Sequence, residues 1–374
     1  MPMDEDEIET GEKKLRIIIA GGGTGGHLFP GIAVGNEFRS RYPESDILFV
    51  TAGRDIESQI LNKAGFRQEC LRVEGIKGKG IVKSLVSLLK LPGSLFQSIG
   101  IIKRFSPDII LGVGGYSSGP LCMSGKLMRV PVAIHEQNSY PGLTNRLLSR
   151  VVDRIFISFE ESREYFPAGS LCLTGNPVRK NFKGDFKPLS GQKDIFTIFV
   201  TGGSQGAVAV NSVFLEALSI MKKRGISPKV IHHAGQYDYE RVVKEYREKD
   251  LEGDVSAFID NMPEAYKNAD IFIGRSGAGT IFELAAMGRP AILIPLPTSA
   301  NNHQVSNAMA LVRAGGAEVM MQDMLDGEKL AEKLTGLINN RDQLVTMAEN
   351  SRKVARLDAA KDIADQMLKL IGKN

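Results

Sequence analysis

One arrangement occurs twice along this chain: an apolar run that ends in a glycine-rich turn. Residues 15–26 read LRIIIAGGGTGG, and residues 196–206 read FTIFVTGGSQG about half a chain later. Each copy predicts a strand that stops in a loop, where glycines allow a positive φ and a close approach of the backbone to a bulky ligand. One such loop alone would say little about function.

The repetition continues in the same order along the chain. Residues 107–119 (PDIILGVGGYSSG) are matched by 269–280 (ADIFIGRSGAGT), and residues 131–138 (PVAIHEQN) by 290–297 (PAILIPLP). Three matched pairs of strand and loop predict two α/β halves of similar build that face each other across a cleft. The strands are continuous apolar runs, which is typical of buried parallel sheets. We expect a first helix at 28–41 and strands at 46–51, 109–113, 132–135, 154–157, 198–201, 229–232, 255–258, 271–274 and 291–295.

Changes in composition predict the domain boundaries. Residues 1–14 are acidic and polar, the reverse of a secretory signal, and are expected to be a disordered tail. A stretch rich in Lys, Gly and Pro follows TGNPVR and is typical of a hinge. We therefore predict an N-terminal domain at 15–180, a C-terminal domain at 181–354, and at 355–374 a helix that completes the second half or crosses back to the first.

The overall composition is that of an ordinary globular protein, with 43% hydrophobic and 24% charged residues in 374. The three cysteines are widely spaced, without a CxxC pair, and no DxD-like pair stands where a metal would hold a diphosphate. We therefore expect no metal and no cofactor. The net charge of +4 is modest, and we expect no nucleic-acid partner.

One segment has charge of a single sign. Between Glu74 and Asp108 there is no acidic residue, whereas Lys77, Lys79 and Lys83 lie among many apolar residues. Such a segment could face anionic lipid, or it could be a helix packed on its own sheet with lysines at the rim. Two lysines, a proline and a glycine interrupt the apolar run, so we do not expect it to span a membrane.

The first glycine loop is open to two interpretations. Gly21, Gly23 and Gly26 satisfy GxGxxG, so a nicotinamide-binding oxidoreductase must be considered. That fingerprint also needs an acidic residue at the tip of the second strand, but residues 51–53 read TAG. The absence of that residue disfavours a dinucleotide site.

His27 follows the last glycine of this loop, where a helix is expected to begin. The positive end of a helix disfavours an imidazolium, so this side chain should be neutral and able to accept a proton. As a general base it would deprotonate a hydroxyl nucleophile. The alternative is a histidine that only caps or packs.

The second half carries groups that suit a sugar nucleotide. Residues 275–280 (RSGAGT) lead into a short helix, whose free N–H groups can bind a diphosphate. Glu283, about one turn along, can accept hydrogen bonds from a ribose diol, or it could be a solvated helix residue. Ser204 and Gln304 could reach phosphate or sugar. Arg179, at the hinge, could contact phosphate.

Together these residues resemble one family, the MurG family of UDP-N-acetylglucosamine–N-acetylmuramyl-(pentapeptide) pyrophosphoryl-undecaprenol N-acetylglucosamine transferases. The resemblance covers nearly the whole chain from Leu15 onward. It implies the GT-B architecture, in which two Rossmann-like, doubly wound parallel-sheet domains face a cleft. The C-terminal domain would hold most of UDP-GlcNAc and the N-terminal domain the lipid acceptor. The matching blocks are GGTGGH (22–27), GVGGYSSGP (112–120), HEQN (135–138), GNPVR (175–179), GGSQG (202–206), RSGAGT with Glu283, and HQVSNA (303–308).

The resemblance also implies which residues bind each substrate. For the acceptor they are Gly114, Gly115, Tyr116, His135 and Glu136. The resemblance also strengthens the expectation, drawn from composition, that Lys77, Lys79 and Lys83 face the membrane surface. The implied UDP-GlcNAc contacts are Thr24, Gly25, Gly26, Asn138, Arg179, Ser204, Ile259, Ala278, Gly279, Thr280, Ile281, Phe282, Glu283 and Gln304.

The implied reaction is an inverting transfer of GlcNAc to the C4 hydroxyl of the muramyl sugar of undecaprenyl-diphosphate-MurNAc-pentapeptide (lipid I). UDP leaves, lipid II forms for peptidoglycan synthesis, and His27 is the candidate base. The resemblance implies a peripheral enzyme at the cytoplasmic face of the inner membrane, with the anionic membrane surface and cell-wall and division proteins as further partners. The alternatives are another GT-B enzyme (a glycolipid glycosyltransferase or a UDP-GlcNAc 2-epimerase), the oxidoreductase, and a noncatalytic sugar-nucleotide sensor.

Overall fold

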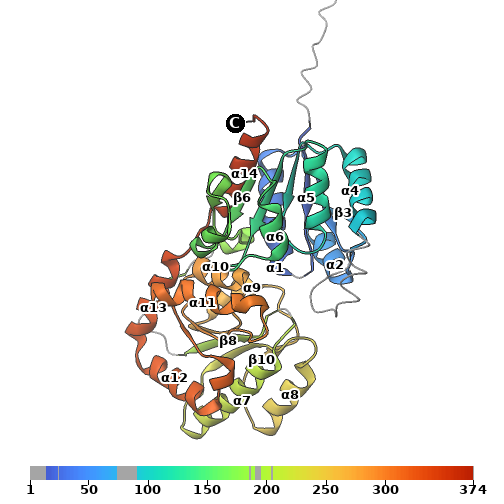
Figure 1. The fold of residues 1–374 in the computed structure, drawn as a ribbon. Coiled ribbons are helices and arrows are strands. Elements are labelled where there is room, and N and C mark those ends of the chain that lie inside the picture. The colour runs from blue at the N-terminus through green and yellow to red at the C-terminus, as the bar shows by residue number, and fades with distance from the viewer. Residues whose placement is uncertain are drawn as a thin grey trace, which may run out of the picture.

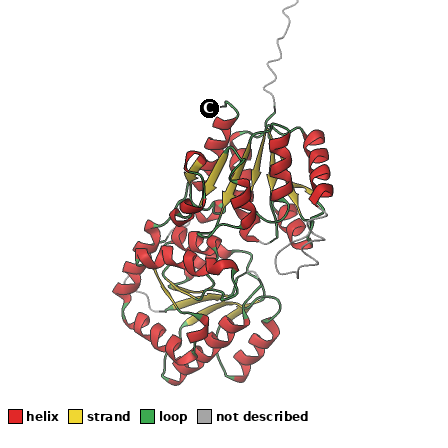
Figure 2. Ribbon diagram, in the orientation of Figure 1, coloured by secondary structure: helices red, strands yellow, loops and turns green. Residues whose placement is uncertain are grey.

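The computed structural model describes residues 14–23, 25–73, 91–184, 187–189, 195–203 and 205–373. They form two lobes, one above the other in Figure 1, and each lobe is a sheet covered by helices (Figure 2). Several predictions fall outside the described residues: the tail up to residue 13, the donor contacts Thr24 and Ser204, and the membrane-patch residues Lys77, Lys79 and Lys83.

The first lobe is built on a parallel sheet whose described strands run in the order β3-β2-β1-β4-β5-β6-β7. The strands are β1 (Arg16–Ala20), β2 (Asp46–Thr51), β3 (Arg67–Cys70), β4 (Ile109–Gly112), β5 (Val132–Glu136), β6 (Arg154–Ile157) and β7 (Leu171–Leu173). The helices between them are α1 (Gly25–Arg41), α2 (Asp55–Lys63), α4 (Leu91–Phe105), α5 (Ser118–Leu127) and α6 (Leu143–Leu148).

The second lobe repeats this plan with the described strand order β10-β9-β8-β11-β12-β13, again all parallel. The strands are β8 (Thr197–Thr201), β9 (Lys229–His233), β10 (Asp254–Ser256), β11 (Ile271–Gly274), β12 (Ala291–Leu293) and β13 (Ala317–Val319). Its helices are α7 (Val208–Lys223), α8 (Tyr239–Glu248), α9 (Met262–Asn268), α10 (Ala278–Met287), α11 (His303–Ala314), α12 (Gly327–Asn339) and α13 (Arg341–Lys353). The last helix of the chain is α14 (Ala359–Leu370).

Both faces of each sheet are buried, which explains the continuous apolar runs in the sequence. In β1, Ile17 and Ile19 pack on one face with residues of α1 and α14, and Ile18 packs on the other with residues of α4 and α5. In β8, Ile198 lies in the core with α7 and α12, whereas Phe199 on the opposite face packs with α10. Alternate side chains therefore anchor helices on both sides of each sheet.

The last helix, α14, joins the first lobe and not the second. Ile363 and Met367 are fully buried in the core cluster that contains β1 and α1. Arg41 of α1 forms an ion pair with Asp365 of α14. Figure 1 shows this red helix beside the first lobe, so the chain crosses between the lobes a second time.

The fold class predicted from the repeat, two doubly wound parallel α/β domains, is confirmed by the strand orders. In such sheets, ligands bind beyond the carboxyl ends of the strands, where the strand order reverses. That point lies between β1 and β4 in the first lobe and between β8 and β11 in the second, and each of these strands ends in one of the glycine loops.

Three short strands, β3, β7 and β13, were not predicted. Each lies at an edge of its sheet and is only partly buried. β3 (RQEC) and β13 (AEV) contain charged residues, and β7 (LCL) is apolar over only three residues, so none has the longer apolar run of a central strand. None of the helices among the described residues has both the length and the apolar character needed to cross a membrane.

Candidate functional site

The two glycine loops of the first lobe touch each other. Gly22 N donates to Gly114 O at 3.3 Å, and Gly114 and Gly115 have φ of +91° and +83°. A Cβ on Gly115 would collide with the backbone of Gly22, and one on Gly114 would lie 2.8 Å from His27 Nδ1. Glycine is therefore required here both for the positive φ and for the close approach.

The first loop already contains an anionic partner, Glu57 of α2. This carboxylate is fully buried and accepts hydrogen bonds from Gly23 N and, at 3.0 Å, from Arg54 N. A pyrophosphate at the same N–H groups would meet a negative charge. This arrangement further disfavours a dinucleotide site in the first loop.

His27 lies in the first turn of α1 and is the first member of a chain of polar contacts. Its Nδ1 lies 3.0 Å from Gln137 Oε1, and Gln137 Nε2 lies 3.1 Å from His135 Nδ1. His135 Nε2 in turn lies 3.3 Å from Gly175 O, in the segment that leads to the second lobe. Burial lowers the pKa of His135 to about 4, so its imidazole is neutral at physiological pH.

Glu136, predicted on the acceptor side, is 2% exposed and binds its own turn. Its carboxylate accepts hydrogen bonds from Asn138 N and Gly142 N, both at 3.0 Å, and from Asn145 Nδ2 at 2.9 Å. The carboxylate thus shapes the loop that carries Asn138. Tyr116, by contrast, is 40% exposed beside the glycine pair at 114–115.

In the second lobe, the N-terminus of α10 has no side-chain cap and no acidic residue in its first turn. The backbone N–H groups of Ala278, Gly279 and Thr280 are therefore available to an anion. The side chains of Ala278, Ile281 and Phe282 are buried in the core, so only their backbone can reach a ligand.

Glu283 lies one turn further along α10, in contact with two other polar side chains. Arg179 Nη2 donates to its Oε1 at 3.2 Å, and the Tyr266 hydroxyl donates to its Oε2 at 3.3 Å. Burial raises the pKa of Glu283, and the Arg179 guanidinium opposes that rise. The carboxylate is thus held at a fixed position between an arginine and a tyrosine.

Gln304 and Ile259 lie elsewhere on this lobe. Gln304 Oε1 accepts a hydrogen bond from Leu296 N at 3.0 Å. The backbone carbonyl of Gln304 accepts one from Ser276 Oγ at 2.8 Å, which joins α11 to the loop before α10. Ile259 is partly buried against the core in the segment after β10.

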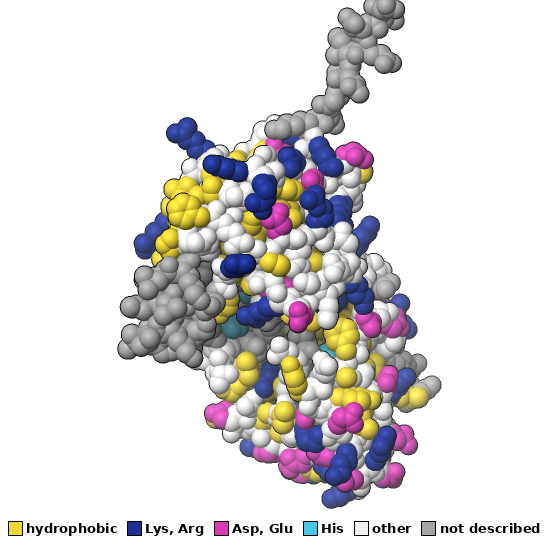
Figure 3. Space-filling model, turned by 90° about the vertical axis from the view of Figure 1, so that its right-hand side faces the viewer, with side chains coloured by type: hydrophobic (Ala, Val, Ile, Leu, Met, Phe, Trp, Pro, Cys, Tyr) yellow, Lys and Arg dark blue, Asp and Glu magenta, His cyan; other side chains and the backbone are white. Residues whose placement is uncertain are grey.

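The side chains of Asn307 and Arg179 make contacts between the two lobes. Asn307 of α11 accepts from Ser139 N at 2.9 Å and donates to Asn138 Oδ1 at 3.2 Å, so it joins the HEQN loop to the second lobe. The Arg179 guanidinium carbon lies 4.7 Å from the ring centroid of Phe29 in α1. Figure 3 shows a recess between the lobes in which histidine side chains are visible. The predicted base and Glu283 thus belong to elements on opposite sides of one junction, α1 and α10, which are in contact.

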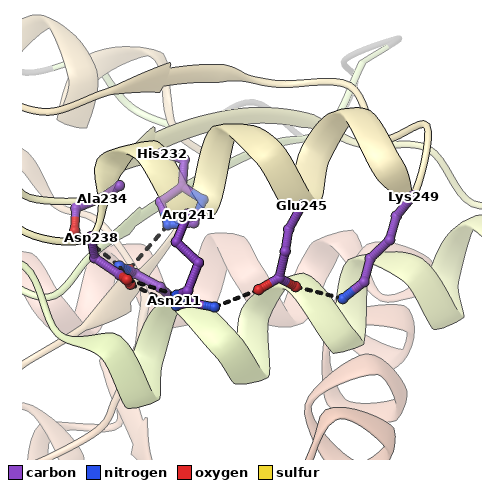
Figure 4. A network of polar contacts seen from close by, with 7 residues as sticks. All are labelled: Asn211, His232, Ala234, Asp238, Arg241, Glu245 and Lys249. Atoms are coloured by element: carbon purple, nitrogen blue, oxygen red, sulfur yellow. Dashed lines mark hydrogen bonds and ion pairs between the residues drawn. The ribbon is translucent and has the colours of Figure 1, made fainter.

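A polar network supports the glycine loop after β8 (Figure 4). Asn211 Nδ2 donates to Ala234 O at 2.9 Å and to Asp238 Oδ2 at 2.8 Å, and Asp238 is paired with Arg241. A Cβ on Gly206 would collide with Ala234 O, so the network supports the backbone directly behind the loop.

Sequence reasoning missed Gln137, Asn307, Tyr266 and Glu57. Gln137 and Asn307 lie inside the HEQN and HQVSNA blocks, so their position was a usable signal. No motif marks Tyr266 or Glu57. Within the described parts of the chain, no three His, Cys, Asp or Glu side chains are grouped as a metal ion would require.

Comparison with protein families gives two matches that follow the two lobes. Residues 17–157 match the glycosyltransferase family 28 N-terminal domain, and residues 197–367 match the family 28 C-terminal domain. Two relatives bear the name UDP-N-acetylglucosamine–N-acetylmuramyl-(pentapeptide) pyrophosphoryl-undecaprenol N-acetylglucosamine transferase. The protein of Syntrophus aciditrophicus is 43% identical over 357 residues, covering 96% of this chain and 99% of the relative. That of Geobacter sulfurreducens is also 43% identical over 357 residues, covering 95% and 98%.

Solved structures agree with this result. The crystal structure of MurG from Acinetobacter baumannii has a TM-score of 0.76 at 29% identity and covers 95% of this chain and 99% of its own. A UDP-GlcNAc 2-epimerase from Neisseria meningitidis, bound to UDP-GlcNAc, has a TM-score of 0.65 at 16% identity, covering 95% and 100%. The second similarity is one of fold alone.

Proposed function

Because the chain belongs to the MurG family of family 28 glycosyltransferases, we propose that it transfers GlcNAc from UDP-GlcNAc to lipid I, giving lipid II for peptidoglycan synthesis. One observation carries the proposal beyond family membership. A histidine at the start of α1 and an uncapped helix N-terminus followed by Glu283 lie on elements that are in contact where the lobes join. The first suits activation of a hydroxyl, and the second suits a nucleotide sugar.

On the donor side, the N–H groups of Ala278 to Thr280 bind the diphosphate of UDP-GlcNAc. Positive partial charge at this helix terminus stabilises the UDP that leaves. The Glu283 carboxylate accepts hydrogen bonds from the ribose diol, and Arg179 neutralises phosphate charge. The segment at Ile259 offers backbone groups to uracil, and Gln304 offers an amide to the sugar.

On the acceptor side, the C4 hydroxyl oxygen of the muramyl sugar attacks the anomeric carbon of GlcNAc. A new C–O bond forms, the bond from the anomeric carbon to the β-phosphate oxygen breaks, and the configuration at that carbon inverts. His27 takes the hydroxyl proton, a contribution of about 10²- to 10⁴-fold for a positioned base. Tyr116 and the backbone at Gly114 and Gly115 bind the acceptor diphosphate.

The reaction is tested by incubating the full chain with labelled UDP-GlcNAc and a lipid I analogue. The proposal predicts a disaccharide-lipid product, with UDP released in equal amount. Free ManNAc would indicate an epimerase, and donor binding without turnover would indicate a sugar-nucleotide sensor. Either result contradicts the proposal.

We also propose that the enzyme acts as a peripheral protein at the cytoplasmic face of the inner membrane. Its acceptor is a lipid, and the segment that contains Lys77, Lys79 and Lys83 is basic and apolar. Helix α4 begins directly after that segment, exposes 75% of Phe96 and carries Lys103 and Arg104 in its last turn. Neutralising the three lysines should weaken binding to vesicles that contain anionic lipid but not binding of UDP-GlcNAc. Unchanged vesicle binding would contradict this part of the proposal.

A further inference from the structure

The Gln137 side chain lies between two imidazoles, and its orientation follows from a third contact. Its Nε2 lies 2.9 Å from Val113 O. A carbonyl oxygen only accepts hydrogen bonds, so the atom that faces it is the NH₂ group of the amide. The other end of the amide, Oε1, is therefore an acceptor. Gln137 is 2% exposed, which leaves it little room to choose other partners.

The position of the proton on His135 follows from this orientation. Gln137 Nε2 also faces His135, with Nδ1 at 3.1 Å and the backbone O at 3.4 Å. An amide NH₂ group cannot accept a hydrogen bond, so His135 Nδ1 is the acceptor and carries no proton. The single proton of this neutral ring is then on Nε2, where Gly175 O at 3.3 Å and Ser158 Oγ at 3.2 Å are both able to accept it. Ser158 donates its own proton to Glu136 O at 3.0 Å, which leaves its lone pairs free for this purpose.

The same reasoning applies to His27 on the other side of the amide. Gln137 Oε1 lies 3.0 Å from His27 Nδ1 and can only accept a hydrogen bond. Nδ1 must therefore carry the proton, since the other tautomer would set two lone pairs against each other. The lone pair of the neutral His27 ring is then on Nε2.

We propose that Gln137 is a positioning residue that holds His27 in the Nδ1–H tautomer, with Nε2 free to accept the proton of the acceptor hydroxyl. This inference rests on the proposed role of His27 as the base. When Nε2 takes up the proton, the bond from Nδ1–H to Gln137 Oε1 becomes charge-assisted and stronger. Gln137 therefore supports both the correct tautomer and the imidazolium that forms.

Gly175, the last member of this series of polar contacts, lies at the junction between the lobes. Gly175 has φ of +83°, and a Cβ there would collide with Arg356 and lie 3.3 Å from Phe282 of α10. The carbonyl that accepts from His135 thus belongs to a residue packed between the lobes. The proton arrangement at His27 is set by Gln137, which Val113 O orients, and the same amide links His27 to His135 and Gly175.

The direct test is ¹⁵N NMR of the full chain with labelled histidine, because protonated and unprotonated ring nitrogens have different shifts. The His27 signals are identified by their loss in His27→Ala. The neutral wild-type ring should be protonated at Nδ1 and unprotonated at Nε2. A neutral His27 ring with its proton on Nε2 would overturn the inference from the wild-type protein alone.

Variants then separate positioning from packing. Gln137→Met removes the acceptor at similar length and should give mixed tautomers at His27, a kcat lower by about ten- to a hundredfold, and a KM for UDP-GlcNAc within about twofold of wild type. Gln137→Glu keeps an acceptor toward His27, and its protonated carboxyl group keeps a donor toward Val113 O, so in that form the variant should retain the tautomer. The matched control Gln68→Met changes a glutamine that contacts Ser58 and Cys70, away from the site, and should leave His27 and kcat unchanged.

Two outcomes distinguish this inference from the proposed function. If folded Gln137→Met keeps the wild-type tautomer and kcat, the inference about Gln137 is wrong, whatever the role of His27. If the His27 tautomer changes in Gln137→Met but His27→Ala retains normal turnover, then His27 is not the base. In that case Gln137 sets the tautomer of His27 without contributing to catalysis.

Discussion

Removal of one buried amide, that of Asn307, tests whether the lobes are held together where the structure places their contact. Its Oδ1 accepts from Ser139 N at 2.9 Å and from Ser139 Oγ at 3.0 Å. Its Nδ2 donates to Asn138 Oδ1 at 3.2 Å and to Ser276 O at 3.3 Å. Asn307→Ala deletes all four contacts at once.

The expected effect follows from burial. Asn307 and Ser139 are 0% and 2% exposed, so the Ser139 N–H would be left without an acceptor in the interior. A buried unsatisfied donor costs about 1–3 kcal/mol, and each further neutral hydrogen bond contributes about 1 kcal/mol or less. We therefore expect Asn307→Ala to lower the free energy of unfolding by about 2–4 kcal/mol. We also expect the KM for UDP-GlcNAc to rise, because Asn138 loses its partner from the second lobe.

Urea denaturation followed by circular dichroism measures the first effect, and steady-state kinetics the second. Asn350→Ala is the matched control. The Asn350 amide makes only exposed contacts, with Gly315 O at 3.5 Å and with Lys353 Nζ at 2.8 Å, so its loss should change stability by less than about 0.5 kcal/mol. If Asn307→Ala unfolds like this control and has an unchanged KM, then Asn307 does not hold the lobes together.

Three further predictions concern the donor carboxylate, the glycine pair and acid stability. Glu283→Gln should raise the KM for UDP-GlcNAc by about tenfold or more through loss of charge-assisted hydrogen bonds, whereas Glu332→Gln, at an exposed position of α12, should not. Gly114→Ala, at φ of +91° and against the candidate base, should lower kcat and the melting temperature. Gly336→Ala, inside helix α12, meets no neighbour, so it should leave kcat unchanged and should not lower the melting temperature. Burial lowers the pKa of His232 from 6.5 to about 3, so its contribution to stability is present above pH 6.5 and is lost as the pH falls toward 3. Between pH 6.5 and about pH 4.5 the loss is roughly 2 kcal/mol, and urea titrations should show a shallower dependence in His232→Gln.

The central part of the fold could be predicted from the sequence because central parallel strands are buried on both faces. The sequences of β1 and β8 are therefore nearly continuous apolar runs, and each is followed by a glycine loop. The edge strands β3, β7 and β13 pair on one side only. β3 and β13 mix apolar and charged residues and β7 is only three residues long, so periodicity does not identify them. The sequence also does not show which lobe α14 joins, because an apolar helix face does not identify the surface on which it packs.

The candidate site could be predicted in part, since its loops follow predictable strand ends. The contacts between residues of the site could not be predicted. Asn307 meets Ser139 across 168 positions, and Gln137 meets His27 across 110, so these contacts depend on how the lobes and loops pack. Glu57 looks like an ordinary charged residue of a short helix, yet it is fully buried because the first glycine loop folds over it. The assignments of individual donor and acceptor contacts stay predictions.

The central claim is that the first lobe activates the acceptor through His27 while the second lobe holds the donor. The most direct measurement compares kcat with the dissociation constant of UDP for His27→Ala and wild type. The account predicts a kcat lower by about 10²-fold or more and a UDP affinity within about twofold of wild type. A His27→Ala enzyme with near-normal kcat would contradict it.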